Sequence, residues 1–198
     1  MQDVAQSCEP RGGNRLMKGA IFLDRDGVII ENRENYVREW NEVSFIPGSL
    51  ETLRRLAELE TTVVIVTNQA CIGREIVTLE KVWEIQNRIV EAIHAAGGRI
   101  AKSYLCPHKP EDHCNCRKPK PGMLFRAATE FDMKLNESWM IGDSLTDIEA
   151  SKAAGCRPIL VQTGKGREQA GRNSDRKLIV LADLKSAVDF ILNSTAGL

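Results

Sequence analysis

The sequence Ala-Ile-Phe-Leu-Asp-Arg-Asp-Gly at residues 20–27 decides how the rest of the chain is interpreted. The apolar run Ala20–Asp24 is typical of a short strand buried on both faces of a parallel sheet. Two carboxylates, Asp24 and Asp26, stand at its end. Carboxylates beside buried apolar residues cost free energy unless they are paired, hydrogen-bonded or bound to a cation. The stretch therefore predicts a functional site at the carboxyl end of this strand.

Strand and helix patterns alternate along the rest of the chain. Apolar, β-branched runs predict further strands at residues 62–67, 103–106, 139–142, 158–162 and 178–181. Apolar residues at helical spacing predict helices at 50–59 with Ser49 as N-cap, at 79–96 with Thr78 as N-cap, and at 121–133, 146–154 and 184–192. The polar segment 164–177 is expected to be a mobile loop. Together these patterns predict an α/β, Rossmann-like three-layer sandwich with a mostly parallel central sheet.

Composition fits one cytoplasmic domain. The chain has 198 residues, with 27 Lys and Arg against 27 Asp and Glu. This zero net charge gives no electrostatic reason to expect nucleic-acid or membrane binding, and no apolar stretch approaches the roughly 18 residues of a membrane span. We expect a disordered tail at residues 1–17, a single domain at 18–198 and a monomer. Three cysteines clustered at 106–116, without an export signal, indicate a metal site in a reducing compartment.

Polar side chains follow three of the predicted strands. Asp24 and Asp26 follow the first, the triplet 67–69 (Thr-Asn-Gln) follows the second, and Asp143 follows the fourth. Ligands of such sheets bind beyond the carboxyl ends of the strands. Carboxylates gathered there would repel one another, so a hard divalent cation with oxygen ligands, such as Mg²⁺, is expected between them.

These residues resemble the four motifs of the haloacid-dehalogenase superfamily of phosphatases, in order along the chain. The resemblance implies that Asp24 is the nucleophile and forms an aspartyl-phosphate, and that Asp26 is the general acid and base. Magnesium would be held by Asp24, the backbone carbonyl of Asp26, and Asp143. Thr67 and a lysine would contact the phosphoryl oxygens. Asp147 would orient its neighbours or, alternatively, only stabilise a helix N-terminus.

The cysteine cluster predicts a structural zinc site in a loop at residues 106–116. Two close pairs, Cys106 with His108 and Cys114 with Cys116, offer three thiolates and one imidazole. Such a closed tetrahedral set leaves no open position for catalysis, so the ion would brace the loop. His113 is the alternative imidazole.

The loop also narrows the resemblance. Cys-Pro-His, then Cys-x-Cys-Arg-Lys-Pro, together with the motifs at 24–27 and 67–69, is similar to the D-glycero-D-manno-heptose 1,7-bisphosphate 7-phosphatases and the bacterial histidinol-phosphate phosphatases. In these families the lysine, here Lys118, stabilises the phosphoryl group, and the preceding arginine helps to recognise the substrate; Lys120 is the alternative lysine. The substrate contacts that the resemblance implies are Asn32, Tyr36, Asn68, Gln69 and Arg117.

The resemblance implies a magnesium-dependent phosphatase that removes the 7-phosphate of the heptose bisphosphate, a sugar phosphate used for lipopolysaccharide precursors. One position departs from the family, because Ser144 replaces a lysine that often contacts substrate. No large cap insertion separates the first two motifs. The alternatives are a histidinol-phosphate phosphatase, a polynucleotide 3′-phosphatase, which the neutral charge and the absence of a kinase P-loop disfavour, and a non-catalytic, zinc-stabilised binding protein.

Overall fold

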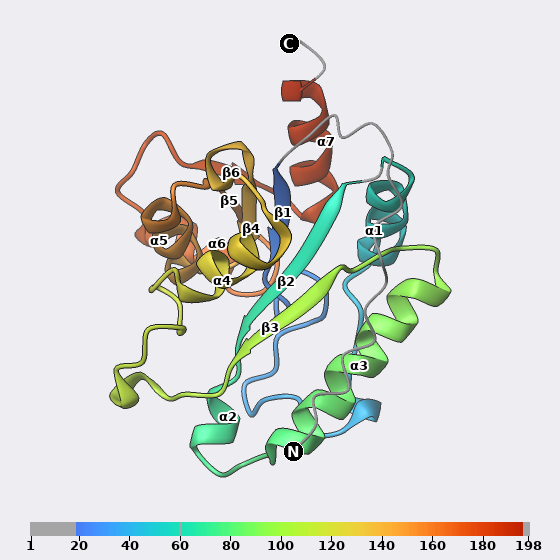
Figure 1. Cartoon of the computed structure of the whole chain (residues 1–198), viewed down its shortest axis with the longest axis vertical. Helices are drawn as coiled ribbons and strands as arrows, with labels where there is room; N and C mark the ends of the chain where they lie inside the picture. Colours follow the sequence, from blue (N-terminus) through green and yellow to red (C-terminus); the bar gives the residue numbers. More distant parts are fainter. Residues whose placement is uncertain (1–18, 60, 196–198) are drawn as a thin grey trace.

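Six strands form the central sheet of the protein (Figure 1). The computed structural model describes residues 19–59 and 61–195, so the predicted disordered tail at 1–17 lies outside the described part of the chain. The strands are β1 (Ala20–Leu23), β2 (Thr62–Asn68), β3 (Lys102–Cys106), β4 (Trp139–Gly142), β5 (Arg157–Val161) and β6 (Ile179–Leu181). Their order is β3-β2-β1-β4-β5-β6, and every neighbouring pair is parallel. The predicted parallel sheet is confirmed.

Helices cover both faces of this sheet. They are α1 (Ser49–Glu58), α2 (Ala70–Gly73), α3 (Leu79–Ala95), α4 (Gly122–Phe131), α5 (Leu145–Ala154), α6 (Gly166–Arg172) and α7 (Leu184–Thr195), with the 3-10 helices η1 (Trp40–Glu42), η2 (Pro110–Asp112) and η3 (Leu135–Glu137). Helices α1, α3 and α7 lie on one face of the sheet, and α4 and α5 lie on the other (Figure 1). The buried apolar residues of each group join a separate core cluster. The result is the expected three-layer sandwich.

Strand β1 shows why its sequence is apolar throughout. It lies between β2 and β4, and its side chains alternate between the two faces. Ile21 and Leu23 join the cluster under α1, α3 and α7, whereas Ala20 and Phe22 join the cluster under α4 and α5. Each larger side chain buried in this way contributes about 1.5–3 kcal/mol of hydrophobic stabilisation. Because β1 lies between β2 and β4, the first polar residue after it, Asp24, lies near the centre of the carboxyl edge of the sheet.

Two local expectations about helices are corrected by the structure. Gly48, with φ 81°, is the N-cap of α1, and the buried hydroxyl of Ser49 has no hydrogen-bond partner within the described residues. The polar segment after β5 contains α6 rather than only a mobile loop. In contrast, Thr78 caps α3 as expected, because its side chain accepts a hydrogen bond from Lys81 N.

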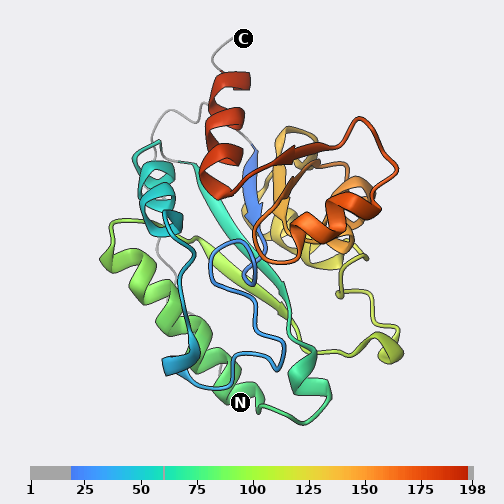
Figure 2. The ribbon, with the colours of Figure 1, turned by 180° about the vertical axis from the view of Figure 1, so that it is seen from behind.

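The connection between β1 and α1 leaves the carboxyl edge of the sheet without a cap domain. In the described part of the chain, residues 24–48 contain no helix or strand longer than η1 (Figure 2). Strand order reverses between β1 and β4, and ligands of open α/β sheets bind at such a point. Within residues 19–59 and 61–195, no helix is long and apolar enough to span a membrane.

Candidate active site

The ends of three adjacent strands bring the predicted catalytic residues together. Asp24 follows β1, Thr67 lies near the end of β2, and Asp143 directly follows β4. Because β1 pairs in parallel with both β2 and β4, the three strands end at the same edge of the sheet. Asp24 N donates to Ile141 O at 3.0 Å, so the backbone of Asp24 is bonded to β4, the strand that precedes Asp143.

Carboxylate oxygens of Asp24, Asp143 and Asp147 lie within 4.8 Å of one another. Burial raises the pKa of Asp24 to about 8; Lys118 opposes this rise and the neighbouring carboxylates add to it. Burial also raises the pKa of Asp143 to about 6, with a further contribution from Asp147. A nearby cation would stabilise the ionised form of carboxyl groups whose pKa is raised in this way.

Lys118 supplies one positive charge to this cluster. Its Nζ lies 2.9 Å from Asp24 Oδ1 and 2.6 Å from Asp147 Oδ1, and it donates to Val66 O at 2.8 Å. Burial alone would lower the pKa of Lys118, but Asp147 and Asp24 outweigh burial and raise it, so the side chain stays charged. Lys120, the alternative lysine, is exposed and donates to His113 O.

Asp147 is fully buried and has two functions. Its Oδ2 accepts hydrogen bonds from the backbone N and the hydroxyl of Ser144, forming a capping box at the start of α5. Its Oδ1 pairs with Lys118. The residue therefore caps α5 and also pairs with the lysine, and its carboxylate lies in the same cluster as those of Asp24 and Asp143.

Asp24 and Asp143 are suited to hold a magnesium ion. Asp24 Oδ1 accepts from Arg25 N and contacts Lys118, whereas Asp24 Oδ2 has no hydrogen bond within the described residues. Asp143 Oδ2 accepts two hydrogen bonds, and Asp143 Oδ1 likewise has none in the described part of the chain. Each carboxylate thus keeps one oxygen for a cation or substrate, and hard oxygen ligands are those that Mg²⁺ prefers.

Asp26 is held by a residue that sequence reasoning missed. Arg25 is only 2% exposed, and its Nε and Nη2 each donate to an oxygen of Asp26 at 3.0 Å. Gln69 Nε2 donates to Asp26 Oδ2 and to Thr67 Oγ1, both at 2.8 Å. The position of Arg25 between two carboxylates, directly after a buried strand, was the signal that could have revealed this role.

The other residues expected to contact substrate make hydrogen bonds within the protein. Asn68 bonds through its amide to the backbone N and O of Lys118, and Arg117 donates to His108 O. Tyr36 Oη accepts from Arg74 Nη1. Tyr36 and Asn32 line a pocket of about 560 Å³ formed by the segment 31–44. Asn32 also reaches the active site, because its Nδ2 donates to Asp143 Oδ2 at 2.5 Å.

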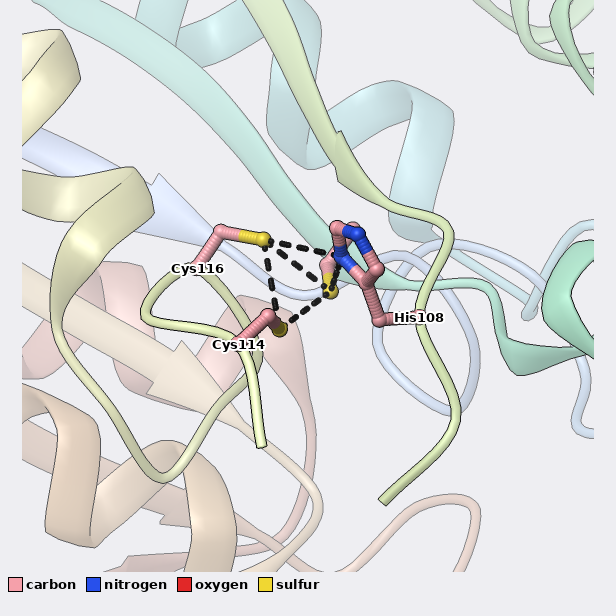
Figure 3. A group of neighbouring side chains, drawn as sticks. His108, Cys114 and Cys116 are labelled. Atoms are coloured by element: carbon pink, nitrogen blue, oxygen red, sulfur yellow. Dashed lines mark hydrogen bonds between the residues drawn. The ribbon is translucent and has the colours of Figure 1, made fainter. Parts of the chain in front are cut away.

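The four predicted zinc ligands form a compact cluster (Figure 3). Their sulfur and Nδ1 atoms are 3.3–3.7 Å apart in the contacts among Cys106, His108, Cys114 and Cys116. A tetrahedral zinc ion with Zn–S of about 2.3 Å and Zn–N of about 2.0 Å requires ligand separations of roughly 3.6–3.8 Å. The geometry is therefore compatible with zinc. His113 is exposed and lies outside the cluster.

Comparison with known proteins places the chain among phosphatase sequences. A family model described as HAD-hydrolase-like matches residues 115–187. A Pseudomonas aeruginosa protein named D-glycero-beta-D-manno-heptose-1,7-bisphosphate 7-phosphatase is 36% identical over 177 residues, which cover 89% of this chain and 99% of the relative. A protein of the same name from Neisseria meningitidis serogroup A is 40% identical over 148 residues, covering 75% of this chain and 79% of the relative.

Comparison with solved structures also finds heptose bisphosphate phosphatases. The D,D-heptose 1,7-bisphosphate phosphatase from B. bronchiseptica, complexed with magnesium and phosphate, is similar with a TM-score of 0.85 and 36% identity, over 89% of this chain and 99% of that chain. The corresponding enzyme from Burkholderia thailandensis has a TM-score of 0.69 and 30% identity, over 88% of this chain and 98% of that chain.

Proposed function

Because the chain belongs to the heptose bisphosphate phosphatase family of the haloacid-dehalogenase superfamily, we propose that it removes the 7-phosphate of D-glycero-beta-D-manno-heptose 1,7-bisphosphate. The protein is a phosphoric monoester hydrolase. The observation that carries the proposal is the arrangement of Asp24 and Asp143 oxygens within 4.8 Å of each other, with Lys118 Nζ 2.9 Å from Asp24. The relatives named for the β anomer support that anomer as substrate.

In the proposed mechanism, an oxygen of Asp24 attacks phosphorus as the bond to the sugar oxygen breaks. Asp26 gives its proton to that leaving oxygen, and the phosphoryl group remains on Asp24. Asp26 then takes a proton from water, which attacks phosphorus and releases inorganic phosphate. Since Arg25 binds both oxygens of Asp26, proton transfer requires the carboxyl group to turn away from Arg25.

Asp24, the carbonyl oxygen of Asp26, and Asp143 would hold magnesium. When bound, the ion supplies positive charge to the phosphoryl oxygens and to the carboxylates. Lys118 adds a second positive charge beside Asp24, and Thr67 adds a hydroxyl. Fixed donors and cations of this kind stabilise the charge of the phosphoryl group in the transition state.

We also propose that Tyr36, Asn68, Gln69 and Arg117 form the region that recognises the sugar phosphate, whereas Asn32, which was expected to share this role, acts on the magnesium ligand Asp143 instead. The pocket along residues 31–44 would hold the sugar, and one residue that lines it, Asn32, also contacts Asp143. Ser144 lacks the positive charge that heptose phosphatases often place there. We further propose that the cysteine cluster binds zinc and that residues 18–198 form a single domain. The protein would act as a monomer in the cytoplasm, where thiols remain reduced.

A substrate panel tests the proposed function. Phosphate release should be measured with magnesium on the β and α anomers of the heptose bisphosphate, histidinol phosphate and a 3′-phosphorylated oligonucleotide. We expect the highest kcat/KM for the β anomer. A higher value for histidinol phosphate or the oligonucleotide would refute the substrate assignment, and no release from any substrate would support a binding protein.

The nucleophile is tested by Asp24→Asn. The amide cannot form an acyl phosphate by attack on phosphorus, so turnover should fall to background, while the circular dichroism spectrum should stay that of the wild type. Retained turnover in a folded Asp24→Asn protein would show that another group attacks phosphorus.

A further inference from the structure

Asn32 makes a direct contact with a predicted magnesium ligand. Its Nδ2 donates to Asp143 Oδ2 at 2.5 Å, and the backbone N of Lys165 donates to the same oxygen at 2.8 Å. Asp143 is 3% exposed, so these two donors fix a carboxylate that solvent scarcely reaches. Because both donors use Oδ2, they leave Oδ1 as the oxygen available to a cation.

Two glycines enclose this hydrogen bond. Gly27 and Gly164 have φ values of 84° and 55°, and a methyl group at either position would overlap Asp143 Oδ2 and approach Asn32 Nδ2 to 2.5 Å. Glycine adopts positive φ without steric cost and allows the backbone to come close to another group. Thr163 Oγ1 donates to Gly27 O at 2.6 Å and joins the two glycine-containing turns. The segments 27–32 and 163–165 therefore pack closely around Oδ2 of Asp143.

We propose that Asn32 is a positioning residue for magnesium: it orients Asp143 and so raises the affinity of the protein for Mg²⁺ rather than for the sugar phosphate. A hydrogen bond to an ionised carboxylate is stronger than one to a neutral group, so a sugar hydroxyl would not displace Asp143 from the amide. Partners that hold a metal ligand in place set metal affinity, and their loss typically lowers it by about 10- to 100-fold. The inference rests on the magnesium site of the proposed function.

Substitution of Asn32 is a practical test because the residue is only partly buried and belongs to no helix or strand. Asn32→Ala removes the donor and the side-chain volume. Asn32→Leu removes the donor but keeps a side chain of similar size, which separates the hydrogen bond from packing. Asn41→Ala is the matched control, since Asn41 is exposed and its side chain makes no hydrogen bond within the described residues.

Calorimetric titration of the magnesium-free proteins with MgCl₂, without substrate, is the primary measurement. We expect Asn32→Ala and Asn32→Leu to raise the dissociation constant for Mg²⁺ by about tenfold or more, and Asn41→Ala to leave it within about twofold. In activity assays, the Mg²⁺ concentration for half-maximal rate should rise by the same factor. At saturating Mg²⁺, the KM for the heptose bisphosphate should stay within about twofold of the wild-type value.

The opposite pattern would overturn the inference. If Asn32 contacts the substrate instead, both variants will keep the wild-type dissociation constant for Mg²⁺ and show a raised KM at saturating Mg²⁺. A wild-type protein that binds no Mg²⁺ at millimolar concentration would also overturn it. A wild-type protein that binds Mg²⁺ but does not hydrolyse the heptose bisphosphate would refute the proposed function alone, because the calorimetric comparison uses no substrate.

Discussion

Lys118 shows how one side chain organises the centre of the site. Its ammonium group donates a hydrogen bond to the carbonyl of Val66 and forms ion pairs with Asp24 and Asp147. The side chain is 2% exposed, so its charge is not offset by water. Without this cation, the carboxylates of Asp24 and Asp147 would face each other in a buried space, and the phosphoryl group would approach uncompensated negative charge.

The two candidate lysines give a direct test of this role. Lys118→Met should lower kcat by a factor on the order of 10²–10³, because it removes a buried charge beside the nucleophile. Lys120→Met should leave kcat within about twofold, because Lys120 is exposed and bonds to His113 and Asn115 in the preceding loop. Steady-state rates of both folded variants provide the measurement. A larger loss of kcat in Lys120→Met would assign the catalytic cation to Lys120.

At the residue scale, the sequence predicted the types of group in the site better than their contacts. Asp24 and Asp143 could be selected because carboxylates directly after apolar strands need a cation. The hydrogen bond of Asn32 to Asp143 joins residues 111 positions apart, and nothing in the local pattern specifies such a contact. The pairing of Arg25 with Asp26 depends on side-chain conformations that spacing alone does not determine.

At the scale of elements, the loop that follows β3 carries the cluster of predicted zinc ligands. Cys106 ends β3, and the other ligands lie in the irregular segment that follows. Burial raises the pKa of the Cys106 thiol, so a bound cation is needed to keep the sulfur ionised at neutral pH. The ion would hold together a loop that otherwise has only the short helix η2.

Removal of one ligand should therefore affect both metal content and stability. Cys114→Ser should reduce bound zinc well below one ion per chain and lower Tm by about 5–10 °C, as expected if metal binding contributes a few kcal/mol to folding. Cys156→Ser is the control, because Cys156 is buried outside the cluster and should retain zinc. Elemental analysis and thermal unfolding provide the two measurements. Equal zinc content in the two variants would contradict a structural zinc site.

Helix α6, like the shorter helix α2, was not predicted from the sequence. Its seven residues include two glycines and four charged or amide side chains, so it has no apolar face to reveal it. Its position depends on tertiary contacts: Gly166 is buried against the end of β5, and Gln169 Oε1 accepts from Leu145 N at 3.3 Å. Helices of this length are stabilised by packing rather than by propensity.

The two glycines of α6 test this packing. A methyl group on Gly166 would overlap the carbonyl oxygen of Val161, whereas one on Gly171 would meet open space. Gly166→Ala should therefore destabilise the protein by about 1–3 kcal/mol. Gly171→Ala should be neutral or stabilise it by up to about 1 kcal/mol, because alanine favours the helix. Equal free energies of unfolding for the two variants, measured in urea, would indicate a segment that is not docked as a helix.

At the scale of the whole molecule, the fold could be predicted because its strands are strongly marked. Apolar runs separated by helical periods leave a parallel α/β sandwich as the natural arrangement. The order β3-β2-β1-β4-β5-β6 places β1 at the centre of the sheet, and the sequence alone does not specify this order. What it does predict is that functional groups lie at the strand ends, wherever those strands stand in the sheet.

The carboxylate cluster should make global stability depend on pH and magnesium. The pKa of Asp143 in the folded protein is raised to about 6 and that of Asp24 to about 8, both from the reference value of 3.8. Between the reference pKa and the raised pKa of each group, the folded state therefore binds more protons than the unfolded state. Stability of the magnesium-free protein should therefore fall as pH rises from about 4 to about 8.

Magnesium would replace these protons and offset the loss. The Mg²⁺-induced rise in Tm should therefore be larger at pH 8 than at pH 6, and Asp143→Asn should reduce it at both pH values. Thermal unfolding with and without MgCl₂ measures the effect. A rise in Tm that is equal at the two pH values would show that the cluster does not exchange protons for the cation.

Because Cys116 and Lys118 are close in sequence, reagents that attack the cysteine cluster are expected to lower turnover without entering the substrate site. Only one residue separates the last sulfur of the cluster from the lysine beside Asp24. Copper, cadmium and peroxide attack thiolates, and displacement of that sulfur would shift the adjoining backbone and withdraw the ammonium group. Hydrolysis would then stop with all carboxylates intact, and additional Mg²⁺ would not restore it. The enzyme is thus expected to require reducing conditions and freedom from strong chelators during purification, although the proposed mechanism assigns no step to the cluster.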